Sequence, residues 1–124
     1  MKLPHPLTML AWIAIIAAPF AIAAGVIALL PPGIEQVPLH FDLEGNANRY
    51  GSPLELYVIA GIMGGANLLM FAMYLFSDAL YDRGLVHGVS RRATRPLLLG
   101  TGVFLDLVFA FCMISIFAQI QSAL

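Results

Sequence analysis

Long apolar runs alternate with short polar segments along this chain, and three runs are long enough to cross a membrane as helices. A helix needs about 20 apolar residues to cross the hydrocarbon of a bilayer. The runs cover residues 7–30, 54–76 and 97–118. This pattern predicts an all-α integral membrane protein, in which residues 1–124 form one three-helix domain with a structured extracytoplasmic loop between the first two helices.

Prolines and a serine mark the expected ends of these helices. Two successive prolines from Pro31 stop the first helix. Ser52 suits the N-cap of the second helix and Pro53 its first position. Pro96 is expected to precede the third helix. Pro19 lies inside the first run, where neighbouring helices can satisfy the carbonyl that it frees, so we expect a kink. That run exceeds the roughly 7–15 apolar residues of a cleaved signal peptide, which favours an uncleaved helix.

The composition indicates that lipid is the solvent for much of the surface. Hydrophobic residues make up 60% of the chain and charged residues 10%, against about 45–50% and about 25% in soluble domains. The net charge of −1 provides no bulk basic field for nucleic acid. The single cysteine, Cys112, allows neither a disulfide nor a cysteine metal cluster within one chain.

The placement of lysine and arginine predicts the orientation, because cytoplasmic loops carry an excess of both. The loop at 31–53 holds one arginine, whereas the loop at 77–96 holds four. Lys2 lies before the first helix. We therefore expect the N-terminus and the basic inner loop in the cytoplasm, and the 31–53 loop and the C-terminus outside. The same arginines also suit anionic lipid head groups.

Two polar residues are expected near the middle of the membrane. At about 1.5 Å per residue, Asn67 lies about 16 Å from the outer edge and Asp106 about 14 Å from the inner edge. Both depths fall near the midplane of a core about 30 Å thick. We therefore predict a hydrogen bond between Asn67 and Asp106. The pair is either a helix-packing contact with a neutral carboxylic acid or part of a proton or ion path, and the lone ionisable group favours the first.

Small residues on the second helix indicate close helix packing. Gly61 and Gly65 form a G-x-x-x-G pattern, which lets helix backbones approach closely in lipid. The contact can lie within the chain or between two chains. A homodimer through Gly61 and Gly65 is therefore one expectation, and pairing with a second membrane protein is another.

The polar loop between the first two helices holds the candidate binding residues. Apolar side chains alternate with polar ones over residues 37–42, which predicts a short extended segment. Residues 43–46 form a predicted turn in which Gly45 adopts a positive φ, and we expect turn conformation to continue to Ser52. Hydrogen bonds among His40, Asp42 and Arg49 are expected to hold this loop. The candidate binding residues are His40, Asp42, Gly45, Asn48, Arg49 and Gly51.

The loop lacks the residue set that a metal centre or an enzyme site requires. One histidine and no cysteine fall short of the four ligands of structural zinc, and the carboxylates are too sparse for a calcium loop. His40 and Asp42 are residue types suited to a base and its orienting group, yet no serine or cysteine nucleophile accompanies them. The sequence therefore predicts no catalytic residue, no metal and no cofactor.

The stretch LLPPGIEQVPLHFDLEGNANRYGSPLE resembles the signature of a family of small bacterial membrane domains. In that family a motif of roughly [IV]-P-x-H-[WF]-[ND]-x-x-G-x-x-[DN]-x-[WYF]-G-[ST] lies between the first two transmembrane helices. The resemblance covers about residues 7–76. The motif is matched by Pro38, His40, Phe41, Asp42, Gly45, Asn48, Tyr50, Gly51 and Ser52.

The family is a domain of unknown function, best known as the N-terminal half of SdpI-type immunity proteins, which protect a cell from a secreted peptide toxin and signal its presence. The resemblance implies a location in the bacterial cytoplasmic membrane. It also implies that the loop's shape or ligand surface depends on His40, Asp42, Gly45 and Gly51. Asn48 stands where the family often has Asp, and Pro53 where it often has Lys. SdpI-type proteins carry further helices after this domain, so their activity is not transferred as a whole.

Sequence and resemblance together predict a non-enzymatic bacterial membrane protein with a recognition loop on its outer face, acting in toxin immunity, sensing or envelope homeostasis. The expected partners are membrane lipid and either a peptide or a second membrane protein, and nucleic acid is not expected. The alternative is a subunit of a transporter or permease that uses Asp106 and Asn67 in an assembled pore. The concentration of polar residues in the outer loop favours the first hypothesis.

Overall fold

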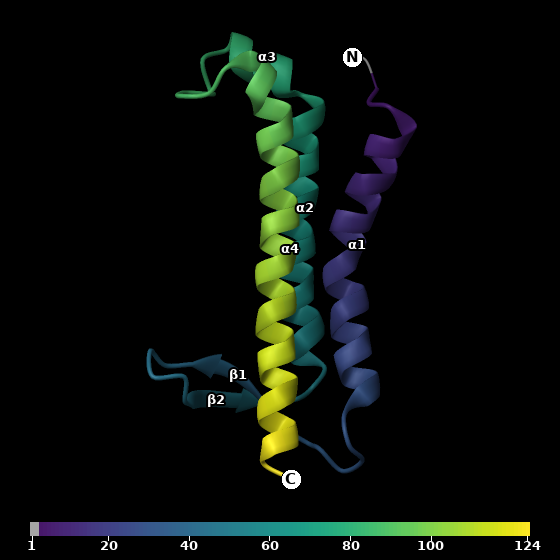
Figure 1. The fold of residues 1–124 in the computed structure, drawn as a ribbon, viewed down its shortest axis with the longest axis vertical. Coiled ribbons are helices and arrows are strands. Elements are labelled where there is room, and N and C mark those ends of the chain that lie inside the picture. The colour runs from purple at the N-terminus through teal and green to yellow at the C-terminus, as the bar shows by residue number, and fades with distance from the viewer. Residues whose placement is uncertain (1–2) are drawn as a thin grey trace.

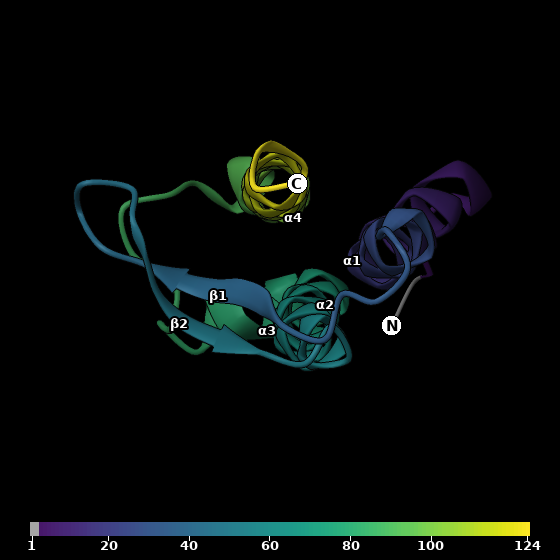
Figure 2. The ribbon, with the colours of Figure 1, turned by 90° about the horizontal axis from the view of Figure 1, so that it is seen from below.

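The computed structural model describes residues 3–124, which form three long helices, one short helix and a β-hairpin. The elements are α1 (Pro6–Leu29), β1 (Val37–Phe41), β2 (Ala47–Gly51), α2 (Glu55–Leu75), α3 (Ser77–Asp82) and α4 (Arg91–Ser122). The long helices pack side by side, with the hairpin beside the C-terminal end of α4 and α3 at the opposite end (Figure 1). Viewed along the bundle, the hairpin lies on the side of α2 away from α1 (Figure 2).

The prediction of three helices able to cross a membrane is confirmed. α1, α2 and α4 are each long and apolar enough to span a bilayer. Most of their apolar side chains point away from the bundle, as expected where the surrounding solvent is hydrocarbon. The chain is therefore a membrane protein by helix length and composition.

The bounds of α1 and α2 agree with the sequence prediction to within a residue. His5 caps α1, because its Nδ1 accepts from the backbone N–H of Leu7 at 3.2 Å. Pro19 lies within α1 and is fully buried. α2 begins at Glu55 and its N-cap is Leu54, which has no side-chain capping hydrogen bond, so the prediction of Ser52 as N-cap and Pro53 as first helical residue is wrong. Ser52 Oγ instead accepts from the Leu54 N–H at 3.3 Å in the turn before the helix.

The prediction that Pro96 precedes the third membrane helix is wrong. α4 begins at Arg91 and contains Pro96. Ser90 is its N-cap and accepts from the Ala93 N–H at 3.2 Å. A residue before proline is biased away from helix, but Arg95 is held by α2 and α3: its Nε donates to Ser77 Oγ at 2.9 Å, and its guanidinium lies over the Tyr74 ring. These tertiary contacts hold Arg95, the residue before the proline, in helical conformation, and the helix continues past Pro96.

The segment at 77–96 is not an open loop. Its first residues form α3, which the sequence analysis missed, and its last residues belong to α4. α3 packs against both α2 and α4. The six residues of α3 are too few to show a helical hydrophobic period, and they contain no apolar run.

The buried core joins all three long helices and the first strand. Towards the hairpin it consists of Ala23, Val26, Val37, Leu56, Ala60, Phe109, Met113, Ile116 and Ile120. Towards α3 the fully buried Trp12 packs on Phe71 and Tyr74, with ring centroids 5.5 and 5.4 Å away. Val37 thus anchors the hairpin in the same core that holds the helices together.

Glycines within the bundle allow close helix contacts, but not at the predicted pair. A Cβ on Gly64 would lie 2.5 Å from the Phe20 ring, and one on Gly102 would lie 3.1 Å from Ile15 Cγ2. Gly61 and Gly65 are exposed and have nothing near their missing Cβ atoms. Within residues 3–124 the surface around Gly61 and Gly65 therefore contacts no other helix, and the homodimer stays a prediction.

Candidate functional site

The loop between α1 and α2 is a β-hairpin rather than one extended segment followed by turns. The predicted extended segment is confirmed as β1, and the predicted turn follows it with Gly45 at φ 84°. The expectation of turn conformation from Asn46 to Ser52 is wrong, because residues 47–51 form β2 and pair antiparallel with β1. The pairing is irregular around His40, which lies opposite Arg49.

Asp42 organises the hairpin turn. Its Oδ1 accepts from the backbone N–H groups of Glu44 and Asn46, both at 2.9 Å. Its own N–H donates to the Asn46 carbonyl at 2.9 Å, and its carbonyl accepts from the Gly45 N–H at 3.1 Å. A short polar side chain that bonds nearby backbone in this way favours a turn over continued strand.

The predicted hydrogen bonds among His40, Asp42 and Arg49 are absent from the described residues. His40 Nδ1 instead donates to Asn48 Oδ1 at 2.6 Å, and Arg49 pairs with Glu55 at 3.3 Å. The His40–Asn48 contact joins β1 to β2, whereas the Arg49–Glu55 contact joins β2 to the start of α2. Asp42 has its partners within its own turn.

Gly51 lies where the end of β2 passes close to two side chains. A Cβ at this position would collide with the Glu55 carboxylate and the Leu39 side chain. Gly51 therefore allows Arg49 and Glu55 to pair across the end of the strand. Its contribution is to the shape of the hairpin.

A groove lies between the hairpin and the C-terminal end of α4, and we call it the hairpin groove. Its volume is about 560 Å³. Residues that lie far apart in the sequence form its two walls. One wall comes from Ile34, Gln36, Pro38, Gly45, Asn46, Ala47 and Tyr50, and the other from Gln119, Ile120, Ser122, Ala123 and Leu124.

Among the described residues, one side-chain hydrogen bond joins the two walls. Gln119 Nε2 donates to the backbone carbonyl of Gly45 at 3.2 Å. This bond places the hairpin turn against the last turns of α4. The lining mixes amide side chains, a tyrosine and aliphatic groups, so it offers both hydrogen-bonding groups and apolar contact.

Gly45 is the one predicted binding residue that lines the hairpin groove. The structure places His40, Asn48, Arg49 and Gly51 in contacts that hold the hairpin, and Asp42 in its turn. Sequence reasoning missed Gln36, Tyr50 and Gln119. Gln119, Gln121 and Ser122, which follow a long apolar run, are the signal that could have pointed to the second wall.

The hydrogen bond predicted within the membrane is confirmed. Asn67 Nδ2 donates to Asp106 Oδ1 at 2.7 Å and to the Ile15 carbonyl at 3.1 Å. Asn67 is fully buried, and its Oδ1 accepts no hydrogen bond from the described residues. This one side chain thus links all three long helices, while the half-buried Asp106 lies at the edge of their contact.

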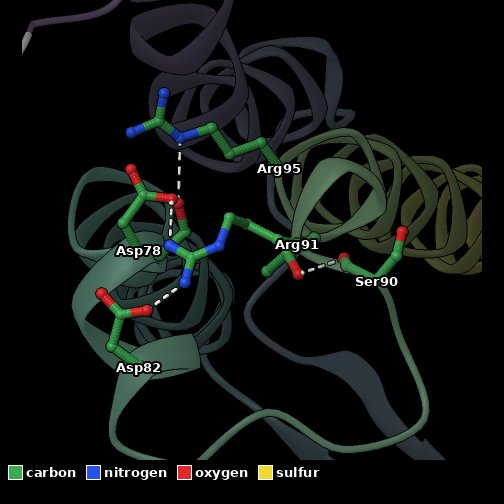
Figure 3. Close-up of polar contacts among 7 residues, drawn as sticks. Asp78, Asp82, Ser90, Arg91 and Arg95 are labelled. Carbon is green, nitrogen blue, oxygen red and sulfur yellow. Dashed lines mark hydrogen bonds and ion pairs between the residues drawn. The ribbon is translucent and has the colours of Figure 1, made fainter.

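At the opposite end of the bundle, two arginines of α4 hold α3. Arg91 reaches the carboxylates of Asp78 and Asp82 (Figure 3) and lies over the Tyr81 ring. The hydrogen bond to Asp82 raises the pKa of the Arg91 guanidinium above its ordinary value. Arg95 donates to Ser77 on the same short helix. These contacts explain why two of the four arginines in the predicted basic loop are structural.

Within residues 3–124, no group of three or more His, Cys, Asp or Glu side chains lies close enough to hold a metal ion. In the hairpin, His40 is instead engaged with Asn48, Arg49 with Glu55, and Asp42 with backbone N–H groups of its turn. The chemistry that this site offers is hydrogen bonding and apolar contact in the hairpin groove.

Comparison with known proteins finds one family. A family described as a domain of unknown function, DUF1648, matches residues 14–64, which run from α1 through the whole hairpin to α2. No curated protein and no solved structure matches the chain. The family match covers part of α1, the whole hairpin and the first half of α2. It leaves out α4, which supplies the second wall of the groove.

Proposed function

We propose that this chain is a non-enzymatic protein of the bacterial cytoplasmic membrane that recognises a ligand at the hairpin end of its helix bundle. The observation that carries the proposal is the hairpin groove of about 560 Å³. This volume lies in the range of about 300–1,000 Å³ typical of small-ligand sites. The excess of arginine in the segment 77–96 supports an outer location for the hairpin.

The groove lining supports binding rather than catalysis. Its polar groups are neutral amides and hydroxyls, from residues such as Gln36, Asn46 and Tyr50, and its apolar groups include Ile34 and Ile120. Such a surface can pair with the backbone of a peptide or with a polar lipid group while covering apolar atoms. The function that fits is recognition in toxin immunity, sensing or envelope homeostasis, with a peptide, a lipid or a second membrane protein as the ligand.

Site-specific photo-cross-linking in intact cells tests the proposal. A photo-reactive phenylalanine replaces Tyr50, which lines the groove, or Leu43, which is fully exposed in the hairpin turn and does not line it. We expect a discrete adduct from position 50 and none from position 43, at equal abundance in the membrane. Identical adducts at both positions, or none at either, would contradict the proposal.

A second candidate function rests on the Asn67–Asp106 contact. A carboxyl group within a membrane span is costly and commonly marks a proton or ion path, and the buried Asn67 Oδ1 has an unused acceptor position. In a transporter or permease subunit, Asp106→Asn would abolish proton or ion flux in proteoliposomes and leave cross-linking at Tyr50 unchanged. Flux that is absent from the parent protein excludes transport by this chain alone.

A further inference from the structure

The Asp106 carboxyl group lies within the membrane-spanning part of α4 and is only partly covered by its own chain. Asp106 stands nine residues after Leu97, where the apolar stretch of α4 begins. At about 1.5 Å per residue it lies about 14 Å along that stretch, near the middle of a hydrocarbon core about 30 Å thick. Asp106 is half-buried, whereas its neighbour Asn67 is fully buried. Part of Asp106 is therefore open at the surface of the bundle.

The hydrogen bonds of Asp106 are incomplete within its own chain. Its Oδ1 accepts from Asn67 Nδ2 at 2.7 Å, and within residues 3–124 its Oδ2 makes no hydrogen bond. An ionised carboxylate is costly in hydrocarbon, and the neutral acid carries an O–H group that needs an acceptor. Lipid chains provide no acceptor. Asp106 therefore needs a further polar partner at this depth.

The surface around Asp106 has the residue spacing of a helix-packing seam, and we call it the α4 stripe. Its members follow one another at intervals of four, three, four and seven residues, which places them on one face of the helix. They are Leu99, Val103, Asp106, Ala110 and Phe117. Val103 is 45% exposed, and the other four are half-buried. The chain therefore covers only part of the α4 stripe, and a second helix can pack on the rest with the small crossing angle common in membranes.

We propose that a second copy of this chain packs against the α4 stripe and that the two Asp106 carboxyl groups form a hydrogen-bonded pair. Two copies inserted in the same orientation place Asp106 at the same depth, so a two-fold axis along α4 brings each Asp106 opposite the other. A neutral carboxylic acid both donates and accepts, so each copy can satisfy the other while it keeps the bond from its own Asn67. This contact lies on a different helix from Gly61 and Gly65, and it does not depend on the proposed function.

Two other arrangements would satisfy the same O–H group, and they predict different results. The first is a hydrogen bond within the chain to Asn67 Oδ1, which is buried and accepts no hydrogen bond within residues 3–124. It would leave the chain with no polar reason to associate at α4. The second is a polar residue of a different membrane protein. Pairing between copies is preferred because it also covers the partly exposed apolar members of the α4 stripe on either side of Asp106.

Disulfide cross-linking of the full chain in membranes tests where the two copies meet. Cys112→Ala first removes the native thiol, and a single cysteine is then introduced by Val103→Cys or by Phe104→Cys. Phe104 is the matched control, because it lies at the same depth and is 63% exposed but is not part of the α4 stripe. We expect a covalent dimer from Val103→Cys on oxidation, and monomer from Phe104→Cys. Equal cross-linking of the two variants, or none from Val103→Cys, would overturn the proposal.

Association measured in liposomes tests the role of the carboxyl group. Single-molecule photobleaching of the labelled full chain gives the dimer fraction as the protein is diluted in lipid. We expect Asp106→Leu to lower the association constant roughly eightfold, the combined effect of two interhelical hydrogen bonds of average strength. Asp106→Asn should retain most of the association, because an amide also donates and accepts. Asn67→Leu removes only the bond within the chain, so it should not weaken association.

A role of Asp106 within its own chain alone would give a different pattern. Asn67→Leu and Asp106→Leu would then change association alike, which would overturn the proposal. A parent chain that stays monomeric at all dilutions, or an Asp106→Leu variant that associates as well as the parent, would also overturn it. Cross-linking of Val103→Cys to a different membrane protein in place of a second copy would assign the α4 stripe to that protein and reject the pairing of two copies.

Discussion

The two ends of the helix bundle carry opposite charge and are held in place by different interactions. The segment 31–55, at the hairpin end, contains four acidic residues and one arginine, whereas the segment 77–96, at the α3 end, contains two acidic residues and four arginines. The hairpin is held mainly by hydrogen bonds between side chains and backbone. The Asp42 carboxylate accepts two of them, and the Gln119 amide donates a third. α3 is held mainly by ion pairs of Arg91 and by Arg95.

This difference shows that some polar groups of this short chain hold its elements in place, whereas others stay exposed at the two ends of the bundle. The polar side chains that build the hairpin leave a neutral groove open beside α4. The arginines at the other end divide into two that fix α3 and two that face outward. Between the ends, Asn67 joins the three membrane helices. Each region can be perturbed separately, which makes the comparison testable.

The largest effect is expected for Asp42→Ala at the hairpin end. The substitution removes the acceptor of two backbone N–H groups, and a typical hydrogen bond contributes roughly 1 kcal/mol net. We expect amide hydrogen exchange in residues 42–48 to accelerate at least about tenfold, with α4 unchanged. Glu44→Ala is the matched control, because the Glu44 side chain makes no hydrogen bond within the described residues. Equal acceleration in both variants would show that Asp42 does not organise the turn.

The next effect is expected for Asn67→Leu in the middle of the bundle. It leaves Asp106 without its donor and frees the Ile15 carbonyl. Hydrogen bonds between membrane helices average about 0.6 kcal/mol and reach about 1.7 kcal/mol, so we expect a loss of unfolding free energy in that range, measured by reversible unfolding in mixed micelles.

The double variant Asn67→Leu with Asp106→Leu provides the control for that loss. It removes both polar groups, and replacing both partners by apolar groups can be nearly neutral. We therefore expect it to recover stability relative to Asn67→Leu alone. A double variant that loses the sum of the two single effects would show that the two side chains act independently.

A smaller effect is expected for Gln119→Ala, which removes the bond between the two walls of the hairpin groove. The hairpin should stay folded but move relative to α4. Spin labels on the turn and at the end of α4 should then report a broader distance distribution. Gln121→Ala is the matched control, because its exposed side chain makes no hydrogen bond within residues 3–124. If both variants broaden the distribution alike, the Gln119 bond does not position the hairpin.

The smallest effect is expected for Arg91→Gln at the α3 end, because exposed ion pairs contribute little. Exchange of the α3 amides should accelerate modestly at low salt, and about 1 M salt should reduce the difference from the parent because it shortens the Debye length to about 3 Å. Arg83→Gln is the control at the same end. A difference that persists in high salt would show that Arg91 acts through packing on Tyr81 rather than charge.

The pKa shift of Arg91 sets the pH dependence of this ion pair on the alkaline side. A group with a raised pKa contributes its stability below its unfolded pKa and loses it only as the pH rises through the folded pKa. Arginine is already charged at neutral and mildly alkaline pH, and the hydrogen bond to Asp82 raises the pKa of Arg91 further above its ordinary value. The salt effect should therefore be the same from neutral to mildly alkaline pH.

Much of this architecture follows from the sequence alone. Three apolar runs, one glycine in a turn (Gly45) and the depth of two polar residues were enough to predict the membrane-length helices, the turn at 43–46 and the Asn67–Asp106 hydrogen bond. These features depend on hydrophobicity, on backbone conformation at single residues and on a fixed rise per residue. Each of these properties can be read from one segment of the chain, or from that segment and the thickness of the bilayer.

Tertiary structure alone decided the site and the ends of the elements. The hairpin groove forms because Gln119 reaches Gly45, 74 positions away in the sequence, and no local pattern encodes that distance. α4 continues through Pro96 because Arg95 is held by Ser77 and Tyr74. A polar side chain in an exposed loop can form hydrogen bonds of similar energy with several different partners. The packing of the helices that carry them selects which partners lie within reach.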